Sequence, residues 1–108
     1  LLDDERNTVY FSLVSVWEVA IKHGRKPDKL TLSPKDFVRY CEEQDFIEYP
    51  LYERHIFTLD PLSRPDTAPE HHDPFDRLLL SQAKADGLTF LTHDTLIPYY
   101  NEPCVMSV

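Results

Sequence analysis

The chain has 108 residues and a formal net charge of −8, from 11 basic and 19 acidic residues. Its length suits one small globular domain, and its acidity disfavours a protein that coats duplex DNA, because such a protein needs a basic face. A nucleic-acid enzyme stays open, since carboxylates can hold a divalent metal that meets the phosphate. No apolar run approaches the roughly 20 residues that span a bilayer, and two cysteines are too few for a disulfide scaffold. We therefore expect a cytoplasmic protein with reduced thiols and no membrane partner.

The hydrophobic pattern alternates between strand-like and helical periodicity along the chain. In order, the predicted elements are a strand at 9–12, a helix at 15–23, a helix at 33–45, a strand at 46–51, a short helix at 53–59, a long helix at 73–86, a strand at 88–92, a short helix at 94–100 and a strand at 104–108. This alternation predicts an α/β domain with a mostly parallel sheet, helices on both faces and right-handed crossovers. In such sheets ligands bind at the carboxyl ends of the strands.

Local signals mark the ends of three of these helices. Ser33 and Asp73 each stand directly before a proline, a pattern typical of an N-cap followed by proline at the first helical position. Gly24 is expected to stop the first helix, and Gly87 is expected to cap the end of the long one.

Glu18 is a single carboxylate in an otherwise apolar predicted helix. Trp17 and Val19 flank it, and a helix that is apolar nearly all round is usually buried. A buried carboxylate must be paired or bound to a metal. The alternative is structural, because Ser15 and Glu18 have the spacing of a capping box.

Two further acids lie where helices begin. Asp76 falls in the first turn of the helix that Asp73 opens, which the helix dipole alone explains, yet it shares a helix face with Leu80 and is therefore expected to point inward. Asp94 follows the strand at 88–92 directly, at its carboxyl end. It is placed to cap the next helix, to bind a metal, or to do both with its two oxygens.

Together these three acids predict a metal site. Oxygen ligands without thiolate or imidazole favour Mg²⁺ or Mn²⁺ over zinc. Such ions activate water and neutralise charge at a phosphodiester. We expect the carboxylates of Glu18, Asp76 and Asp94 to lie within a few ångströms of one another.

Two other groups of residues give weaker evidence for a binding site. His71 and His72 are adjacent, so their side chains rarely converge on one metal, and no spaced partner completes four zinc ligands. Four basic residues fall between positions 22 and 29, either in a solvated loop or at an edge that contacts phosphate.

Three motifs, in order, resemble a known family. They are Val-Tyr-Phe-Ser-x-x-Ser-x-Trp-Glu-Val-Ala-Ile-Lys at 9–22, His-His-Asp-Pro-Phe-Asp-Arg-Leu-Leu-Leu-Ser-Gln-Ala at 71–83, and Leu-Thr-Phe-Leu-Thr-His-Asp at 88–94. They are similar to the PIN domain, and more closely to the VapC-type toxin ribonucleases of bacterial toxin–antitoxin modules. The resemblance implies an α/β/α nuclease with a Mg²⁺ or Mn²⁺ site of four acids. Such an enzyme cuts single-stranded regions of RNA and is silenced by a cognate antitoxin.

The resemblance also implies roles for individual residues. Glu18 matches the acid of the family's Ser-x-x-Glu helix, and Asp76 matches the acid that opens its Asp-Arg-Leu-Leu helix. Asp94 matches the acid after the Thr-x-Asp strand. Asp73 matches a residue close to the metal, which we expect to support the direct ligands.

One part of the family pattern does not match. The family's first acid lies on an N-terminal strand of the type Leu-Leu-Leu-Asp-Thr-His, followed by an apolar helix. Residues 1–4 look similar, but the next predicted strand begins at position 9 and leaves no room for that helix. We therefore expect residues 1–108 to form a single PIN-like domain that lacks the first strand, the first helix and the first acid. The segment 71–76 is also one residue shorter than the family's His-His-x-Asp-Pro-Phe-Asp form.

Two functions follow from these expectations. The first is a metal-dependent endoribonuclease toxin, inactive until its site is completed. The second is a non-catalytic PIN remnant that binds an antitoxin or another partner. A missing central strand leaves backbone groups unpaired, at about 1–3 kcal/mol for each buried group, so we expect a homodimer or a segment-exchanged oligomer.

Overall fold

The computed structural model describes residues 7–25, 32–69, 73–92 and 96–107. The chain separates into two compact units, unit 1 at residues 1–51 and unit 2 at residues 52–108. Each combines helices with short parallel strands, so the broad α/β class is confirmed. The expectation of one PIN-like domain over the whole chain stays a prediction.

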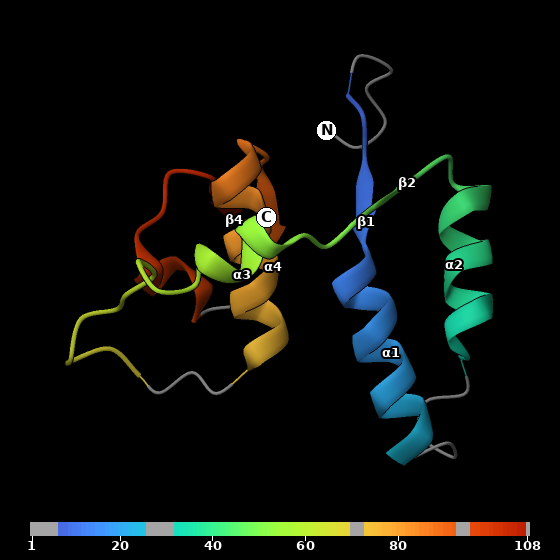
Figure 1. Cartoon of the computed structure of the whole chain (residues 1–108), viewed down its shortest axis with the longest axis horizontal. Coiled ribbons are helices and arrows are strands. Elements are labelled where there is room, and N and C mark those ends of the chain that lie inside the picture. The colour runs from blue at the N-terminus through green and yellow to red at the C-terminus, as the bar shows by residue number, and fades with distance from the viewer. Residues whose placement is uncertain (1–6, 26–31, 70–72, 93–95, 108) are drawn as a thin grey trace. The chain divides into compact units, whose positions relative to one another are not determined.

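Unit 1 is a parallel strand pair connected through two helices. Its elements are β1 (Tyr10–Ser12), α1 (Leu13–Arg25), α2 (Pro34–Glu43) and β2 (Ile47–Tyr49). In Figure 1, β1 runs directly into α1 without a loop. Strands β1 and β2 pair in parallel, with Tyr10 opposite Ile47 and Ser12 opposite Tyr49.

The two faces of this strand pair differ because side chains alternate along a strand. Phe11 is buried and packs edge-on against Phe37 of α2, with ring centroids 6.0 Å apart. Tyr10 and Ile47 lie on the opposite face and are exposed. The rings of Tyr10 and Tyr49 pack edge-on, with centroids 5.1 Å apart. The helices therefore cover one face of β1 and β2 within this unit.

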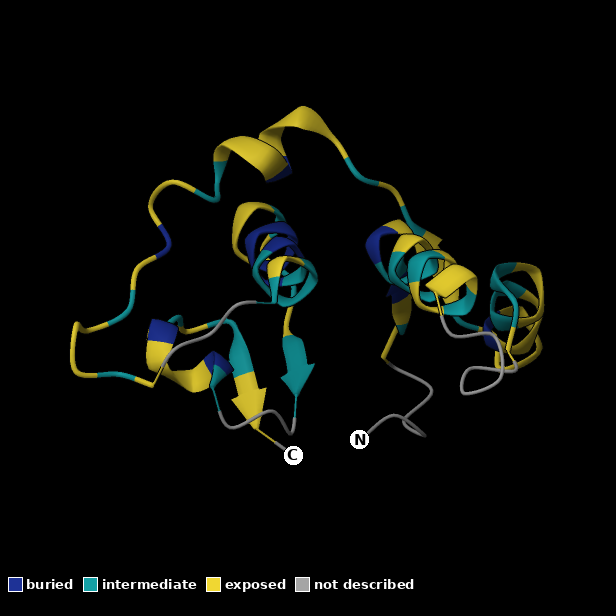
Figure 2. Cartoon of the chain, turned by 90° about the horizontal axis from the view of Figure 1, so that it is seen from below, coloured by how far each residue is buried: buried dark blue, intermediate teal, exposed yellow. Residues whose placement is uncertain are grey.

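Unit 2 is built around a longer helix and a second parallel strand pair. Its elements are α3 (Glu53–Phe57), α4 (Pro74–Asp86), β3 (Phe90–Thr92), the 3₁₀ helix η1 (Ile97–Tyr100) and β4 (Val105–Ser107). Strands β3 and β4 pair in parallel, from Phe90 opposite Val105 to Thr92 opposite Ser107. The core joins Leu62, Leu80, Ile97 and Tyr100, and α4 carries much of the buried surface, dark blue in Figure 2.

All strand pairs in the described part of the chain are parallel, as predicted. They form one two-stranded sheet in each unit. The single sheet with helices on both faces, which a PIN-like architecture implies, stays a prediction. Among the described helices, none is long and apolar enough to cross a membrane.

The helix ends confirm most of the capping predictions. The Ser33 hydroxyl accepts a hydrogen bond from the Asp36 amide at 3.2 Å, and Asp73 caps α4 in the same way. Gly87 ends α4 in the left-handed region at φ 69°, which glycine adopts without strain.

The start and end of α1 differ from the prediction. The helix begins at Leu13, so Ser15 lies inside it and the capping box with Glu18 is wrong. The Ser12 hydroxyl instead accepts from the Val14 amide at 3.0 Å, which moves the helix start to the end of β1. Gly24 does not stop the helix, which continues to Arg25.

The two cysteines provide a test of the packing. Both are free, as expected, and Cys41 is 4% exposed in unit 1. Burial raises the pKa of the Cys41 thiol, and burial followed by the nearby Glu102 carboxylate raises the pKa of the Cys104 thiol. Because the pKa of each thiol is raised in the folded state, its contribution to the free energy of unfolding is fully present at neutral pH. That contribution is lost as the pH rises through the raised pKa.

We therefore expect both thiols to react slowly with Ellman's reagent, because the thiolate is the nucleophile. At pH 8 the native chain should react at least about tenfold more slowly than the chain in concentrated urea. The single variants Cys41→Ser and Cys104→Ser assign the two phases, and Cys41 should be the slower. Native rates equal to the unfolded rates would contradict this packing.

Candidate functional site

The predicted metal ligands lie in different parts of the chain. Glu18 is on α1 in unit 1, and Asp76 is on α4 in unit 2. Asp94 lies outside the described residues, as do His71 and His72. Within the described ranges, no group of three or more histidine, cysteine, aspartate or glutamate side chains could hold a metal ion. The predicted proximity of the three acids stays a prediction.

Glu18 is paired with a cation rather than used as a cap. The Lys22 ammonium lies 2.7 Å from Glu18 Oε2, one helical turn further along α1. The Glu18 side chain is 19% exposed and that of Lys22 is 61% exposed, so the pair is worth only about 0.3–0.5 kcal/mol. A metal at Glu18 would compete with this ammonium for the carboxylate.

The expectation that α1 is buried on all sides is wrong. Val14 is its one buried residue, while Leu13 and Trp17 are 41% and 50% exposed. The reason is that α2 packs against only one side of α1 within unit 1. The apolar composition of α1 therefore does not by itself isolate Glu18 from water.

Asp73 and Asp76 are brought together at the start of α4. Asp73 Oδ1 accepts from the amides of Phe75 at 2.9 Å and Asp76 at 3.2 Å. Both of these bonds use one carboxylate oxygen, so Asp73 can cap the helix and still present Oδ2 to a cation. Asp76 is half-buried in the first turn, where the helix dipole favours an ionised carboxylate.

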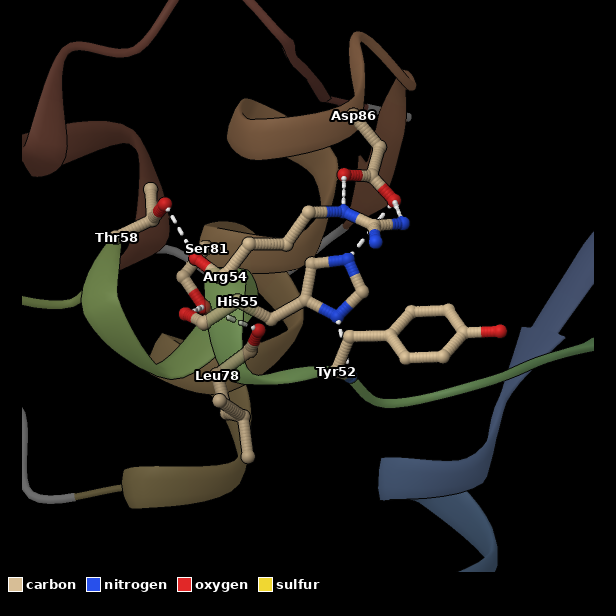
Figure 3. Close-up of polar contacts among 7 residues, drawn as sticks. All are labelled: Tyr52, Arg54, His55, Thr58, Leu78, Ser81 and Asp86. Atoms are coloured by element: carbon tan, nitrogen blue, oxygen red, sulfur yellow. Dashed lines mark hydrogen bonds and ion pairs between the residues drawn. The ribbon is translucent and has the colours of Figure 1, made fainter.

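A polar cluster of the described residues in unit 2 was not predicted from the sequence. It joins α3 to the end of α4 through Arg54, His55 and Asp86 (Figure 3). The Arg54 guanidinium donates to both Asp86 oxygens, from Nε at 2.8 Å and from Nη2 at 2.9 Å. His55 Nε2 lies 2.8 Å from Asp86 Oδ2, and the His55 residue is fully buried.

The hydrogen bonds determine the protonation of the His55 ring. The Tyr52 amide donates to Nδ1 at 2.9 Å, so Nδ1 carries no proton. Nε2 then carries the hydrogen and donates to Asp86. Both ring nitrogens are occupied in this neutral form, so His55 has no nitrogen available for acid–base catalysis.

Ser81 does not extend this cluster into a nucleophilic triad. Its hydroxyl donates to the backbone carbonyls of His55 and Leu78, each at 2.8 Å, and not to the imidazole (Figure 3). A serine nucleophile needs a base at its hydroxyl. The cluster therefore fixes α3 on α4 and is a structural feature of unit 2.

One sequence signal could have revealed this cluster. Asp86 stands in the last turn of α4, directly before the Gly87 cap. A carboxylate at a helix C-terminus is disfavoured by the helix dipole, so an acid there requires a cation from elsewhere. The sequence does not show that Arg54 and His55, more than 30 positions earlier, supply the partners.

Comparisons with protein-family models, with curated proteins and with solved structures returned no match for this chain.

Proposed function

We propose that this chain is the PIN-like part of a metal-dependent endoribonuclease toxin. It would act in the cytoplasm on single-stranded regions of RNA and be silenced by a cognate antitoxin. The proposal is supported by the order of the three motif acids along the chain. Glu18 lies on α1, which follows β1, Asp76 lies in the first turn of α4, and Asp94 stands two positions after Thr92, the last residue of β3. Open α/β proteins bind ligands at the carboxyl ends of their strands, where we expect these acids to meet.

The donor set suits Mg²⁺ or Mn²⁺. Glu18, Asp76 and Asp94 offer carboxylate oxygens, which these ions prefer. Asp73 would hold the start of α4 while its second oxygen supports the ion or a bound water. When bound, such an ion supplies charge neutralisation at the phosphodiester and lowers the pKa of a water nucleophile.

Charge arithmetic predicts that residues 1–108 alone cleave RNA poorly. Two divalent ions hold four positive charges, and three acids supply three negative charges. Mg²⁺ held mostly by water is weakly bound. We expect little cleavage of a single-stranded RNA by the chain alone with Mg²⁺ or Mn²⁺. Addition of a strand of the Leu-Leu-Leu-Asp-Thr-His type, fused to residue 1 or supplied as a second polypeptide, should restore it.

The control for this experiment is the same added strand with its aspartate replaced by asparagine, which should not restore cleavage. Metal-dependent cleavage by the short chain that disappears in its own Asp76→Asn variant would show that no fourth acid is needed. Absence of cleavage in every form would favour the binding remnant, which should then still bind the antitoxin.

A further inference from the structure

One short stretch of this acidic chain is basic. Residues 22–39 carry six basic and two acidic side chains, whereas the rest of the chain carries five basic and 17 acidic ones. In the described part of this stretch, the basic residues lie on two helices of unit 1 and all are exposed. They are Lys22 and Arg25 in the last turn of α1, and Lys35 and Arg39 in the first half of α2.

The fold brings these basic residues to one end of unit 1. Helices α1 and α2 pack against each other, and the strands that they connect, β1 and β2, are parallel. Figure 1 shows the end of α1 and the start of α2 on the same side of the unit, away from the strands. We call Lys22, Arg25, Lys35 and Arg39 the basic end of unit 1.

Helix stability explains only part of this arrangement. A helix dipole favours cations at the C-terminus and anions at the N-terminus, so the two basic residues of α1 suit the place where they stand. In α2 most charges run the other way. Lys35 lies in its first turn, beside Asp36, whereas Glu42 and Glu43 lie in its last turn, which has no basic residue. The cations at the start of α2 therefore indicate a partner with negative charge outside the helix.

The ion pairs within the basic end are weak. Lys22 Nζ lies 2.7 Å from Glu18 Oε2, and Arg39 Nη1 lies 3.6 Å from Asp36 Oδ1. The side chains of Lys22 and Arg39 are 61% and 70% exposed, so water screens both pairs. An incoming anion therefore competes readily with these carboxylates for the two cations.

We propose that the basic end of unit 1 binds the phosphate backbone of single-stranded RNA; the choice of RNA rests on the proposed function. Its cations come from two packed helices, so one strand meets several of them in succession, and such contacts fix the position of a nucleic acid. Arg25 lies about 10 Å along α1 from Glu18, seven residues earlier. A strand that passes Glu18 therefore reaches the basic end, which holds the RNA and takes no part in bond cleavage.

The charges of α2 favour a narrow partner over a flat one. Its exposed residues at positions 35, 39, 42 and 43 have the spacing of one helix face, with two cations near the start and two acids near the end. An anionic membrane laid along this face would meet the acids as well as the cations, whereas a single strand crosses the basic end alone. Tyr40, beside Arg39, is 57% exposed and offers a ring on which an unpaired base stacks.

Fluorescence anisotropy of a labelled single-stranded RNA, in EDTA so that no metal is bound, tests the proposal on residues 1–108. Affinity should fall as salt rises, with a log–log slope of about −3 for four phosphate contacts. The double variant Arg25→Gln, Lys35→Gln should bind at least about tenfold more weakly at 0.1 M salt, with a slope smaller by about 1.4. The control Lys84→Gln removes one positive charge from α4 in unit 2 and should leave the slope unchanged.

Unchanged affinity and slope in the double variant would overturn the proposal, as would tighter binding to phosphatidylserine vesicles than to RNA. Failure of this inference is distinguishable from failure of the proposed nuclease function. Asp76→Asn should bind RNA in EDTA at least as tightly as the unchanged chain. If no form of the chain cleaved RNA and the double variant still lost RNA binding, the nuclease proposal would fail while the basic end remained an RNA-binding surface.

Discussion

Replacing Asp86 with alanine should lower the free energy of unfolding by about 3 kcal/mol. The change leaves the buried His55 without an acceptor for its Nε2 hydrogen and removes the bidentate partner of Arg54. The unpaired Nε2 donor of His55 costs its full desolvation free energy. Loss of the Arg54 ion pair costs less, because the Arg54 side chain is exposed and water screens the interaction. Urea denaturation followed by circular dichroism measures the loss.

A matched substitution isolates the cluster from general effects of charge. Asp66→Ala removes a carboxylate from an exposed turn of the same unit and should change the unfolding free energy by no more than about 0.5 kcal/mol. Asp86→Asn keeps one acceptor and should fall between the two. If Asp86→Ala were as stable as Asp66→Ala, the cluster would not be what holds α3 to α4.

Asp76→Asn should reduce metal-dependent RNA cleavage by on the order of 100-fold or more in a chain completed with the N-terminal strand. Asparagine is nearly the same size but removes the negative charge that would hold Mg²⁺ or Mn²⁺. Mn²⁺ affinity, measured by electron paramagnetic resonance, should fall together with cleavage. Asp76 also lies in the first turn of α4, so some loss of stability, about 0.3–1 kcal/mol, is expected from the helix dipole.

Substitutions at the neighbouring Asp73 distinguish a loss of metal binding from a loss of helix capping. Asparagine is as good an N-cap as aspartate, so Asp73→Asn should keep the helix start and weaken metal binding only modestly. Asp73→Ala should lose about 1 kcal/mol of stability as well. If Asp76→Asn changed stability alone and left Mn²⁺ binding and cleavage intact, Asp76 would be a helix-end residue and not a ligand.

The ends of α2 and α4 were predicted well because a helix cap depends on residues only a few positions apart. Ser33 and Asp73 each satisfy an amide that lies three positions further on, and Gly87 adopts a conformation that other residues avoid. The same local view fails at α1. There the helix begins at Leu13, directly after β1, and the Ser12 hydroxyl accepts from the Val14 amide, so Ser15 lies inside the helix and does not cap it.

The remaining features depend on partners that are distant in sequence. His55 and Asp86 are 31 residues apart, and nothing in the residues around either one identifies the other. The burial of α1 likewise depends on how many elements cover it, and composition alone gave the wrong answer. The metal-site prediction has the same character, since it requires acids from separate segments to meet.

The two strand pairs also imply an order of events in folding. Tyr10 pairs with Ile47, whereas Phe90 pairs with Val105, so the chain between β1 and β2 is more than twice as long as that between β3 and β4. Each doubling of a closed loop costs roughly 0.6 kcal/mol of chain entropy, and contacts between near neighbours form faster. The strands of unit 2 should therefore meet before those of unit 1. A full-length chain refolding from denaturant would therefore close its C-terminal sheet before its N-terminal one.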